Sequence, residues 1–315
     1  MPARVAIVIR TKNRGEFLRR ALADVASQTF DDWEVIVVND RGAREAVEDA
    51  VAVSGIGNKV TIIDTHPPGG RCAAANAGLR ASDAALAVLH DDDDRWHPDF
   101  LQRAVAWLDE HPSDAGVMTA TAIVYEERGA DGWVETARVP YWEGLRAITY
   151  TDLLEINRAV PISFLYRRWL HDDVGFYDES LDAVEDWEFY LRVTLRHHIG
   201  FIGGEPLAYW TQRPAARGDD GNSMFALADQ HERDDVAVRD EALRRWVEEN
   251  GAGLPLYIGL VERRLREDMR TMFDDLLREQ HRLHEARHPI WSRLRRLRHR
   301  LRNAPSRAGG AGEPS

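Results

Sequence analysis

The sequence has one cysteine, Cys72, and only two lysines, Lys12 and Lys59, among its 315 residues. A single cysteine excludes an intramolecular disulfide, a zinc cluster of several thiolates and a Cys-x-x-Cys redox pair. We therefore expect a protein of a reducing compartment, the cytoplasm. Because nearly all the basic residues are arginines and alanine is abundant, we interpret the coding sequence as GC-rich and bacterial.

Long hydrophobic runs are missing as well. The first apolar stretch, residues 5–9, is far shorter than the core of a signal peptide or a membrane span, and no later run is long enough. We expect a cytoplasmic chain with, at most, peripheral contact with the inner face of the membrane.

Positive charge is in deficit: 41 Lys and Arg against 53 Asp and Glu give a formal net charge of −12. This balance argues against a surface that coats nucleic acid, which needs a basic face, so no nucleic-acid partner is expected. A content of 44% hydrophobic residues excludes a wholly disordered chain. The length suits one large domain with an appendage.

Short apolar runs alternate with amphipathic segments in the first hundred residues. The runs are continuous rather than alternating, which predicts parallel strands buried on both faces, at residues 5–9, 33–38, 60–63 and 84–89. Helices are predicted between them, the first with a buried face of Phe17, Leu18, Ala21, Leu22 and Val25. The pattern indicates an α/β fold, a Rossmann-like, mostly parallel sheet flanked by helices. Later segments predict further elements: a helix to residue 110, strands at 117–125, 133–139, 163–166 and 207–210, and a helix at 184–192.

Polar residues follow three of the predicted strands: Thr11, Asp40 and the run from Asp91 to Asp94. Because the carboxyl ends of parallel strands meet at one edge, where ligands bind, these side chains should converge. Asp40 could hydrogen-bond a ribose or a base; alternatively, it solvates a loop or caps a helix.

The four consecutive aspartates repel one another unless a cation neutralises them, and Mn²⁺ or Mg²⁺ is the natural partner. Such an ion takes one or two carboxylates and completes its shell with water and substrate phosphates. The alternative is an acidic surface turn that caps the next helix. The preceding strand and Asp40 at the same edge favour the metal site.

Several other kinds of site have no support. The sequence lacks G-x-G-x-x-G and P-loop motifs, which argues against a dehydrogenase or a kinase, and it lacks a G-x-S-x-G nucleophile. The histidines do not show the spacing of a helical zinc site and are expected at the surface or in loops: His66, His90, His97 and His111. Cys72 is interpreted as a small buried residue.

Glu185 and Asp186 open a predicted helix, whose N-terminus favours ionised carboxylates. One of them could act as a general base. The alternative is the ordinary preference for acids at a helix start.

Taken in order, these segments resemble the family 2 glycosyltransferases of the GT-A fold. The resemblance covers about residues 4–212 and rests on an opening strand and loop, a second block, a nucleotide-side loop, a D-x-D segment and an acceptor-side block: 5–14, 27–40, 69–78, 89–98 and 175–192. Asn39 departs from the family pattern, where aspartate is common, and His90 precedes the acidic run.

The resemblance implies roles for individual residues. Thr11 and Asp40 would hold the nucleotide base, with Asn13 and Arg71 nearby. Asp91 and Asp93 would be the D-x-D pair that binds ribose and metal; Asp92 and Asp94 lie beside them, and the metal register is ambiguous by one residue. Asp186 would be the general base, with Glu185 orienting the acceptor.

The implied reaction is an inverting, metal-dependent transfer of a sugar from a nucleotide-diphosphate sugar, with UDP favoured, to a hydroxyl of a glycan or lipid-linked acceptor. This chemistry belongs to polysaccharide biosynthesis for a cell envelope. The Q-x-x-R-W signature of processive synthases is absent, which favours single additions. The alternatives are a nucleotidyltransferase that makes the sugar nucleotide and a non-catalytic subunit that binds a sugar nucleotide or glycan.

We expect a transferase domain at 1–212, with a nucleotide-binding half to about residue 98 and an acceptor half at 99–212. A mobile loop at 213–224 carries Arg213 and Arg217, which could close over the diphosphate; alternatively, it is a disordered connector. A helical region at 225–302 and a disordered tail at 303–315 follow.

The end of the helical region is amphipathic and basic. It contains seven arginines in the acid-free stretch 287–302, with apolar residues on one face: Ile290, Trp291, Leu294, Leu297 and Leu301. Such a helix could lie on an anionic membrane. Alternatively, it packs on the domain or on a second subunit of a homo-oligomer.

Overall fold

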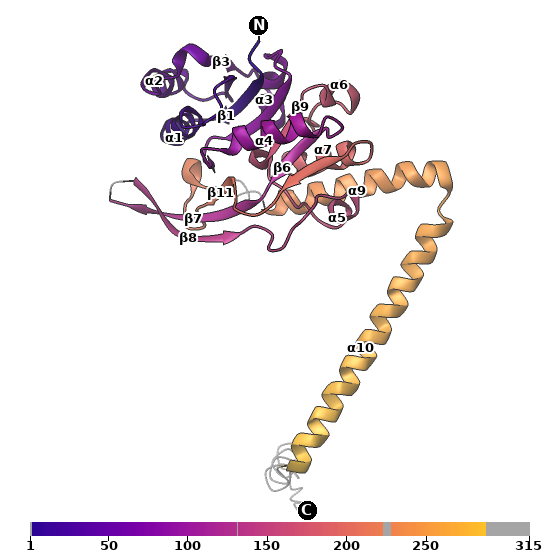
Figure 1. The fold of residues 1–315 in the computed structure, drawn as a ribbon. Coiled ribbons are helices and arrows are strands. Elements are labelled where there is room, and N and C mark those ends of the chain that lie inside the picture. The colour runs from indigo at the N-terminus through magenta and orange to yellow at the C-terminus, as the bar shows by residue number, and fades with distance from the viewer. Residues whose placement is uncertain (1, 131, 223–227, 288–315) are drawn as a thin grey trace, which may run out of the picture. The chain divides into compact units, whose positions relative to one another are not determined.

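The computed structural model describes the chain except residues 1, 131, 223–227 and 288–315 (Figure 1). It contains two compact units, residues 1–240 and 241–315. The basic amphipathic segment expected at 287–302 lies almost entirely outside the described residues, as does the tail at 303–315. No helix in the described part of the chain is long and apolar enough to cross a membrane.

The first unit is built on a seven-stranded sheet in the order β10-β6-β9-β4-β1-β2-β3. Its strands pair in parallel except β9, which runs antiparallel to both β4 and β6. The mostly parallel sheet predicted from the continuous apolar runs is therefore confirmed. The strands are β1 (Val5–Thr11), β2 (Trp33–Asn39), β3 (Val60–Asp64), β4 (Leu86–Asp91), β6 (Gly116–Thr119), β9 (Phe164–Arg167) and β10 (Ile199–Ile202).

Helices cover both faces of this sheet because successive strand residues point to opposite sides. Val5, Ile7 and Ile9 of β1 pack in one core with α1 (Gly15–Ala26), α2 (Arg44–Val53) and α4 (Phe100–Glu110). Ala6 and Val8 pack in the other core with α3 (Arg71–Arg80), α5 (Tyr150–Glu155), α6 (Leu170–Asp173) and α7 (Glu185–Thr194). The α1 face predicted from the apolar spacing is the face that is buried.

A second, four-stranded sheet has the order β5-β11-β7-β8. It comprises β5 (Arg95–Trp96), β7 (Thr121–Gly129), β8 (Gly132–Pro140) and β11 (Ala208–Gln212), with β7 and β8 forming a long hairpin (Figure 1). The single strand predicted at 117–125 is wrong, because the chain changes sheets at Ala120: β6 pairs in the large sheet and β7 in the small one.

Two helices follow the sheets, α9 (Ala228–Asn250) and α10 (Gly253–Arg287). The first half of α9 belongs to the first unit. Asp234 accepts hydrogen bonds from the backbone N–H groups of Asp182 and Ala183 at 3.1 and 2.9 Å, and Arg239 lies 4.7 Å from the ring of Trp187. These contacts attach α9 to α7 and to the segment that leads into it.

Candidate active site

Three adjacent parallel strands bring the predicted polar residues to one edge. β1 lies between β2 and β4, in a register that pairs Thr11 with Asn39 and Arg10 with Asp91. The backbone N–H of Asp40 donates to the carbonyl of Thr11 at 2.8 Å. Thr11, Asp40 and the acidic run therefore converge, as the sequence predicted.

Asp40 is held by the loop that follows β3. Its Oδ1 accepts hydrogen bonds from the Thr65 hydroxyl at 2.8 Å and the Gly70 N–H at 3.2 Å. Burial tends to raise the pKa of Asp40, but these donors and Arg41 outweigh it and lower the pKa. The carboxylate is therefore ionised at neutral pH. Asn13 is exposed, and its side-chain oxygen accepts the N–H of Ala43 at 3.0 Å.

The acidic run alternates between buried and more open side chains. Asp92 and Asp94 are only 3% and 4% exposed, whereas the side chains of Asp91 and Asp93 are 24% and 10% exposed. Asp94 Oδ1 accepts the N–H of Thr211 at 2.7 Å, which joins β11 to the run. Asp94 thus joins the run to β11, while Asp91 and Asp93 are the more exposed members of the run.

Arginines pair with the run. Arg10 Nη2 lies 2.5 Å from Asp91 Oδ1, and Arg14 Nη1 lies 2.9 Å from Asp92 and 3.2 Å from Asp93. Arg213 pairs with Asp93 and lies 4.2 Å from the ring of Phe17. Sequence reasoning missed Arg10 and Arg14, although both fall within the opening segment that carries the family resemblance.

The pKa values of Asp91, Asp92 and Asp94 shift in different directions because their surroundings differ. Burial and the negative charge of Asp93 raise the pKa of Asp92, and Arg14 lowers it; the net result is a pKa of about 7. Burial and the charges of Asp93 and Asp91 raise the pKa of Asp94 well above its usual value. At Asp91, Arg10 and Arg71 outweigh burial and lower the pKa.

The segment expected to be a mobile loop is tied to the acidic run. Arg14 donates to the carbonyls of Asp219 at 2.6 Å and Gly221 at 2.5 Å, while Asn222 Nδ2 lies 3.3 Å from Asp93 Oδ2. Arg213 is 1% exposed. Arg217 instead donates to the carbonyls of Pro214 and Ala216 within its own loop.

Arg10 also connects the acidic run to the start of α7. Its Nη1 lies 3.3 Å from Glu185 Oε1, to which Arg71 Nη2 approaches within 3.1 Å. Glu185 is 2% exposed. One guanidinium therefore bridges Asp91 and Glu185, two acids that are far apart in sequence.

Asp186, the next residue, is only partly buried. Its Oδ2 accepts a hydrogen bond from Asn157 Nδ2 at 2.9 Å. Burial and the charge of Glu185 raise the pKa of Asp186 to about 7, against hydrogen bonds from Trp187 N–H and Asn157. A carboxyl with this pKa can exchange a proton near neutral pH. Nothing in the sequence around Asn157 signalled its role.

Within the described ranges, no group of three or more His, Cys, Asp or Glu side chains could hold a metal ion. A hard divalent ion does not need three, since substrate phosphates and water complete its shell. The more open carboxylates, Asp91 and Asp93, are oxygen ligands of the required kind, so the residues present fit such an ion.

The prediction for His90 is wrong. The sequence places this residue at the surface or in a loop, but it lies in β4 and is fully buried, because β4 extends through it to Asp91. Its ring packs edge-on against Trp96 at 4.3 Å, and burial lowers its pKa. His90 is a neutral core residue directly beneath the acidic run.

Comparison with known proteins agrees with this architecture. A family model described as "Glycosyl transferase family 2" matches residues 6–175, more than half of the chain. The uncharacterized glycosyltransferase YwdF of Bacillus subtilis is 28% identical over 254 residues, which cover 79% of this chain and 85% of YwdF.

The poly(ribitol-phosphate) beta-N-acetylglucosaminyltransferase TarS of Staphylococcus aureus is 23% identical over 215 residues, 66% of this chain and 35% of TarS. The chain thus spans about a third of TarS. A crystal structure of S. aureus TarS 1–349 with UDP-GlcNAc shares the fold, with a TM-score of 0.52 at 19% identity, over 80% of this chain and 75% of that one. The chain belongs to glycosyl transferase family 2 and is a glycosyltransferase of the GT-A fold.

Proposed function

We propose that this glycosyltransferase moves a sugar from a nucleotide-diphosphate sugar to an acceptor hydroxyl in a single inverting displacement. The observation that carries the proposal is the Arg10 bridge, with 2.5 Å to Asp91 and 3.3 Å to Glu185. The bridge brings the acidic run close to Glu185 and so to the adjacent Asp186, which supports one site that would serve both substrates of a transfer.

The donor half is assigned to the edge formed by β1, β2 and β4. Thr11, Asn13 and Asp40 would bind the nucleoside, with Arg71 and Asp92 in the surrounding shell. UDP is the favoured nucleotide, because the TarS structure that shares the fold holds UDP-GlcNAc. The ionised state of Asp40 suits an acceptor of hydrogen bonds from a base or ribose.

Asp93 and Asp91 would hold Mn²⁺ or Mg²⁺ together with the donor diphosphate. The ion, when bound, supplies positive charge that stabilises the departing nucleoside diphosphate. Arg14 and Arg213 contact Asp93, so their guanidinium groups would also lie near the diphosphate and stabilise its charge.

Asp186 would take the proton from the attacking acceptor hydroxyl. Asn157 orients its carboxylate, and the raised pKa makes it a stronger base than an exposed aspartate. Glu185, fixed by Arg10 and Arg71, would hold the start of α7 in place and orient the acceptor. No covalent intermediate on the protein is required, because the acceptor attacks directly.

A glycan or lipid-linked acceptor in bacterial polysaccharide biosynthesis is the acceptor class that we propose. Matching relatives include the putative colanic acid biosynthesis glycosyl transferase WcaA of Escherichia coli and the succinoglycan biosynthesis protein ExoW of Rhizobium meliloti. A cytoplasmic location gives access to nucleotide sugars. The loop at 213–222, with Arg213 on Asp93 and Arg217 near its tip, would cover the diphosphate and exclude water.

Thermal stabilisation by a panel of UDP-, GDP- and dTDP-sugars, each with and without Mn²⁺, tests the proposal. We expect one nucleotide class to raise the melting temperature in a metal-dependent way, and Asp93→Ala to lose the shift. Asp83→Ala, an exposed acid at the opposite end of β4, serves as the matched control and should keep it. No shift with any donor would contradict the donor-site assignment.

A further inference from the structure

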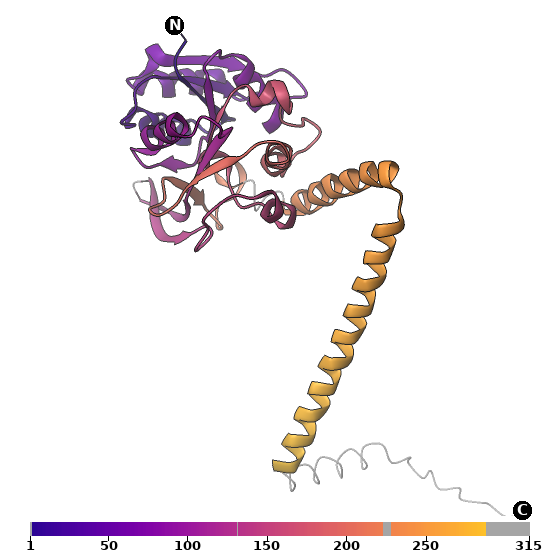
Figure 2. The same cartoon turned by 45° about the vertical axis from the view of Figure 1, so that its right-hand side comes forward.

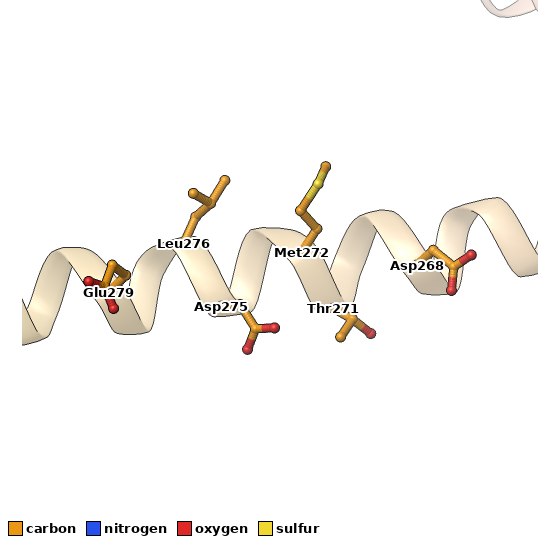
Figure 3. Close-up of a pocket in the computed structure, with 6 residues that line it drawn as sticks. All are labelled: Asp268, Thr271, Met272, Asp275, Leu276 and Glu279. Carbon is orange, nitrogen blue, oxygen red and sulfur yellow. The ribbon is translucent and has the colours of Figure 1, made fainter.

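Helix α10 carries an apolar stripe along one side. The stripe residues are between 36% and 64% exposed: Leu254, Ile258, Val261, Leu265, Met269, Met272, Leu276 and Leu283. Both views of the ribbon show α10 as one uninterrupted helix (Figures 1 and 2). In close-up, Met272 and Leu276 extend from one side of it, away from Asp268, Thr271 and Asp275 (Figure 3).

The stripe follows an eleven-residue repeat. Leu254, Leu265 and Leu276 are spaced by eleven, and so are Val261, Met272 and Leu283. Eleven residues make just over three α-helical turns, at about 3.6 residues per turn, so the apolar positions stay close to one line along a nearly straight helix. A repeat of this kind, held over about three periods, is typical of helices that pair along their length.

The charge of α10 suits pairing with an identical helix. The whole chain has a formal net charge of −12, yet Gly253–Arg287 contains seven acidic residues and seven arginines, which cancel. Pairs such as Arg266 with Glu262 and Arg278 with Asp275 lie within the helix. Two copies can therefore approach along α10 without the repulsion that the rest of the acidic chain would impose.

The same balance disfavours a lipid surface. A helix that lies on an anionic membrane needs a polar face rich in Lys and Arg, and α10 alternates acids with arginines instead. The exposed area of the stripe is also sufficient for a dimer: it sums to roughly 800 Å² per copy, about one partner's share of a standard interface.

We propose that the chain self-associates through α10, with the apolar stripes of two copies packed against each other. The occupant of the stripe is thus a second copy of this chain. The proposal goes beyond the transfer reaction and does not depend on it, because the residues assigned to the reaction lie in the unit 1–240.

Sedimentation velocity of the full chain over a range of concentrations is the test, with a stripe variant and a matched control. The stripe variant is Leu265→Glu with Leu276→Glu. The control is Leu256→Glu, the same change at a leucine that is 73% exposed and lies on the opposite side of the helix. Glutamate and leucine have similar helix propensities, so neither variant should abolish the helix.

We expect the unaltered chain to form dimers, the stripe variant to self-associate at least about 100-fold more weakly, and the control to stay within about twofold of the unaltered chain. A monomeric unaltered chain at about 100 μM, or equal association of all three proteins, would overturn the proposal. So would a monomer that co-sediments with phosphatidylglycerol vesicles through the stripe. Donor-induced thermal shifts measured on the same proteins show whether the catalytic unit is folded in each.

Discussion

Adjacent acidic residues in this site have opposite surroundings. Glu185 is buried between Arg10 and Arg71, whereas Asp186 is partly exposed and hydrogen-bonded to the neutral Asn157. The first is therefore paired with two guanidinium groups, and the second can gain and lose a proton near neutral pH. This difference is the reason that we propose Asp186, and not Glu185, as the general base.

Replacement of Asp186 by asparagine should reduce kcat by at least about 100-fold, because general-base catalysis contributes roughly that much. In the unaltered enzyme, kcat/KM should rise with pH through about 7, where the carboxyl of Asp186 ionises, and then level off. The exposed Asp182→Asn is the control. A variant that keeps its turnover, or a flat profile between pH 5.5 and about 8, would remove the base role.

The same substitution should stabilise the fold at high pH. The folded-state pKa of Asp186 lies above its usual 3.8, so its contribution to stability is complete below that value and is lost as pH rises through about 7. Asparagine cannot ionise, and Asp186→Asn should raise the unfolding free energy at pH 8 by on the order of 1 kcal/mol. Urea denaturation at pH 5 and 8 measures this; an equal effect at both values would contradict it.

Arg10 should matter for stability as well as binding. Its side chain is 7% exposed and faces both Asp91 and Glu185. Arg10→Met leaves these acids without their shared partner, and a loss of about 3 kcal/mol is expected, as for other broken buried pairs. Chemical denaturation gives the value, with the exposed Arg19→Met as control. If Arg10→Met loses no more unfolding free energy than Arg19→Met, the ion pairs of Arg10 with Asp91 and Glu185 contribute little to stability.

At the level of single residues, the sequence predicted the acids better than their partners. Thr11, Asp40 and the acidic run end parallel strands, so the strand pattern alone predicts that they meet. Arg10, Arg14 and Asn157 are partners only through tertiary folding, and no spacing in the sequence links Asn157 to Asp186. The alternation in burial that leaves Asp91 and Asp93 more exposed than Asp92 and Asp94 also follows from tertiary packing, and the four identical residues give no sign of it.

At the level of elements, the position of α3 depends on glycine, because Gly78 lets the helix lie very close to the sheet. A Cβ on Gly78 would collide with Val8 Cγ1 and come within 3.0 Å of Val38 Cγ2. Glycine at this helical position therefore lets α3 lie directly on β1 and β2. Because α3 begins at Arg71, this packing also sets the position of that side chain in the site.

Gly78→Val should cost about 2 kcal/mol or more, since added volume in a packed core displaces its neighbours. Ala81→Val, at the exposed end of the same helix, should stay within about 0.5 kcal/mol of the unaltered chain. Thermal or urea unfolding of both variants measures the difference. If both variants lose the same small amount of unfolding free energy, α3 is not tightly packed against β1.

Apolar periodicity predicted the strands and helices of the first hundred residues closely. It did not predict which sheet a later strand joins or in which direction that strand runs, because these depend on tertiary pairing. The segment 117–125 contains no glycine or proline that would mark a break between two strands, and yet β6 and β7 join different sheets. β9 runs antiparallel within a mostly parallel sheet, a topology that residue spacing does not encode.

At the level of the whole molecule, all the residues assigned to donor binding and catalysis lie in the unit 1–240. A chain that ends after Asn250 keeps α9 complete, including the contacts of Asp234 and Arg239 with the first unit. We expect this shortened chain to fold and to keep its donor-induced thermal shift, measured beside the full chain. Aggregation or loss of the shift would show that α10 supports the catalytic unit.

Calorimetric titration of UDP-, GDP- and dTDP-sugars into three proteins, with and without Mn²⁺, tests the donor site directly. We expect the unaltered chain to bind one nucleotide class. We also expect Asp93→Asn to bind that donor at least about tenfold more weakly, a loss of about 1.4 kcal/mol, and Asp186→Asn to bind it within about threefold of the unaltered chain. Equal binding by the unaltered chain and Asp93→Asn, or binding of no donor at all, would contradict the assignment of the acidic run as the donor site.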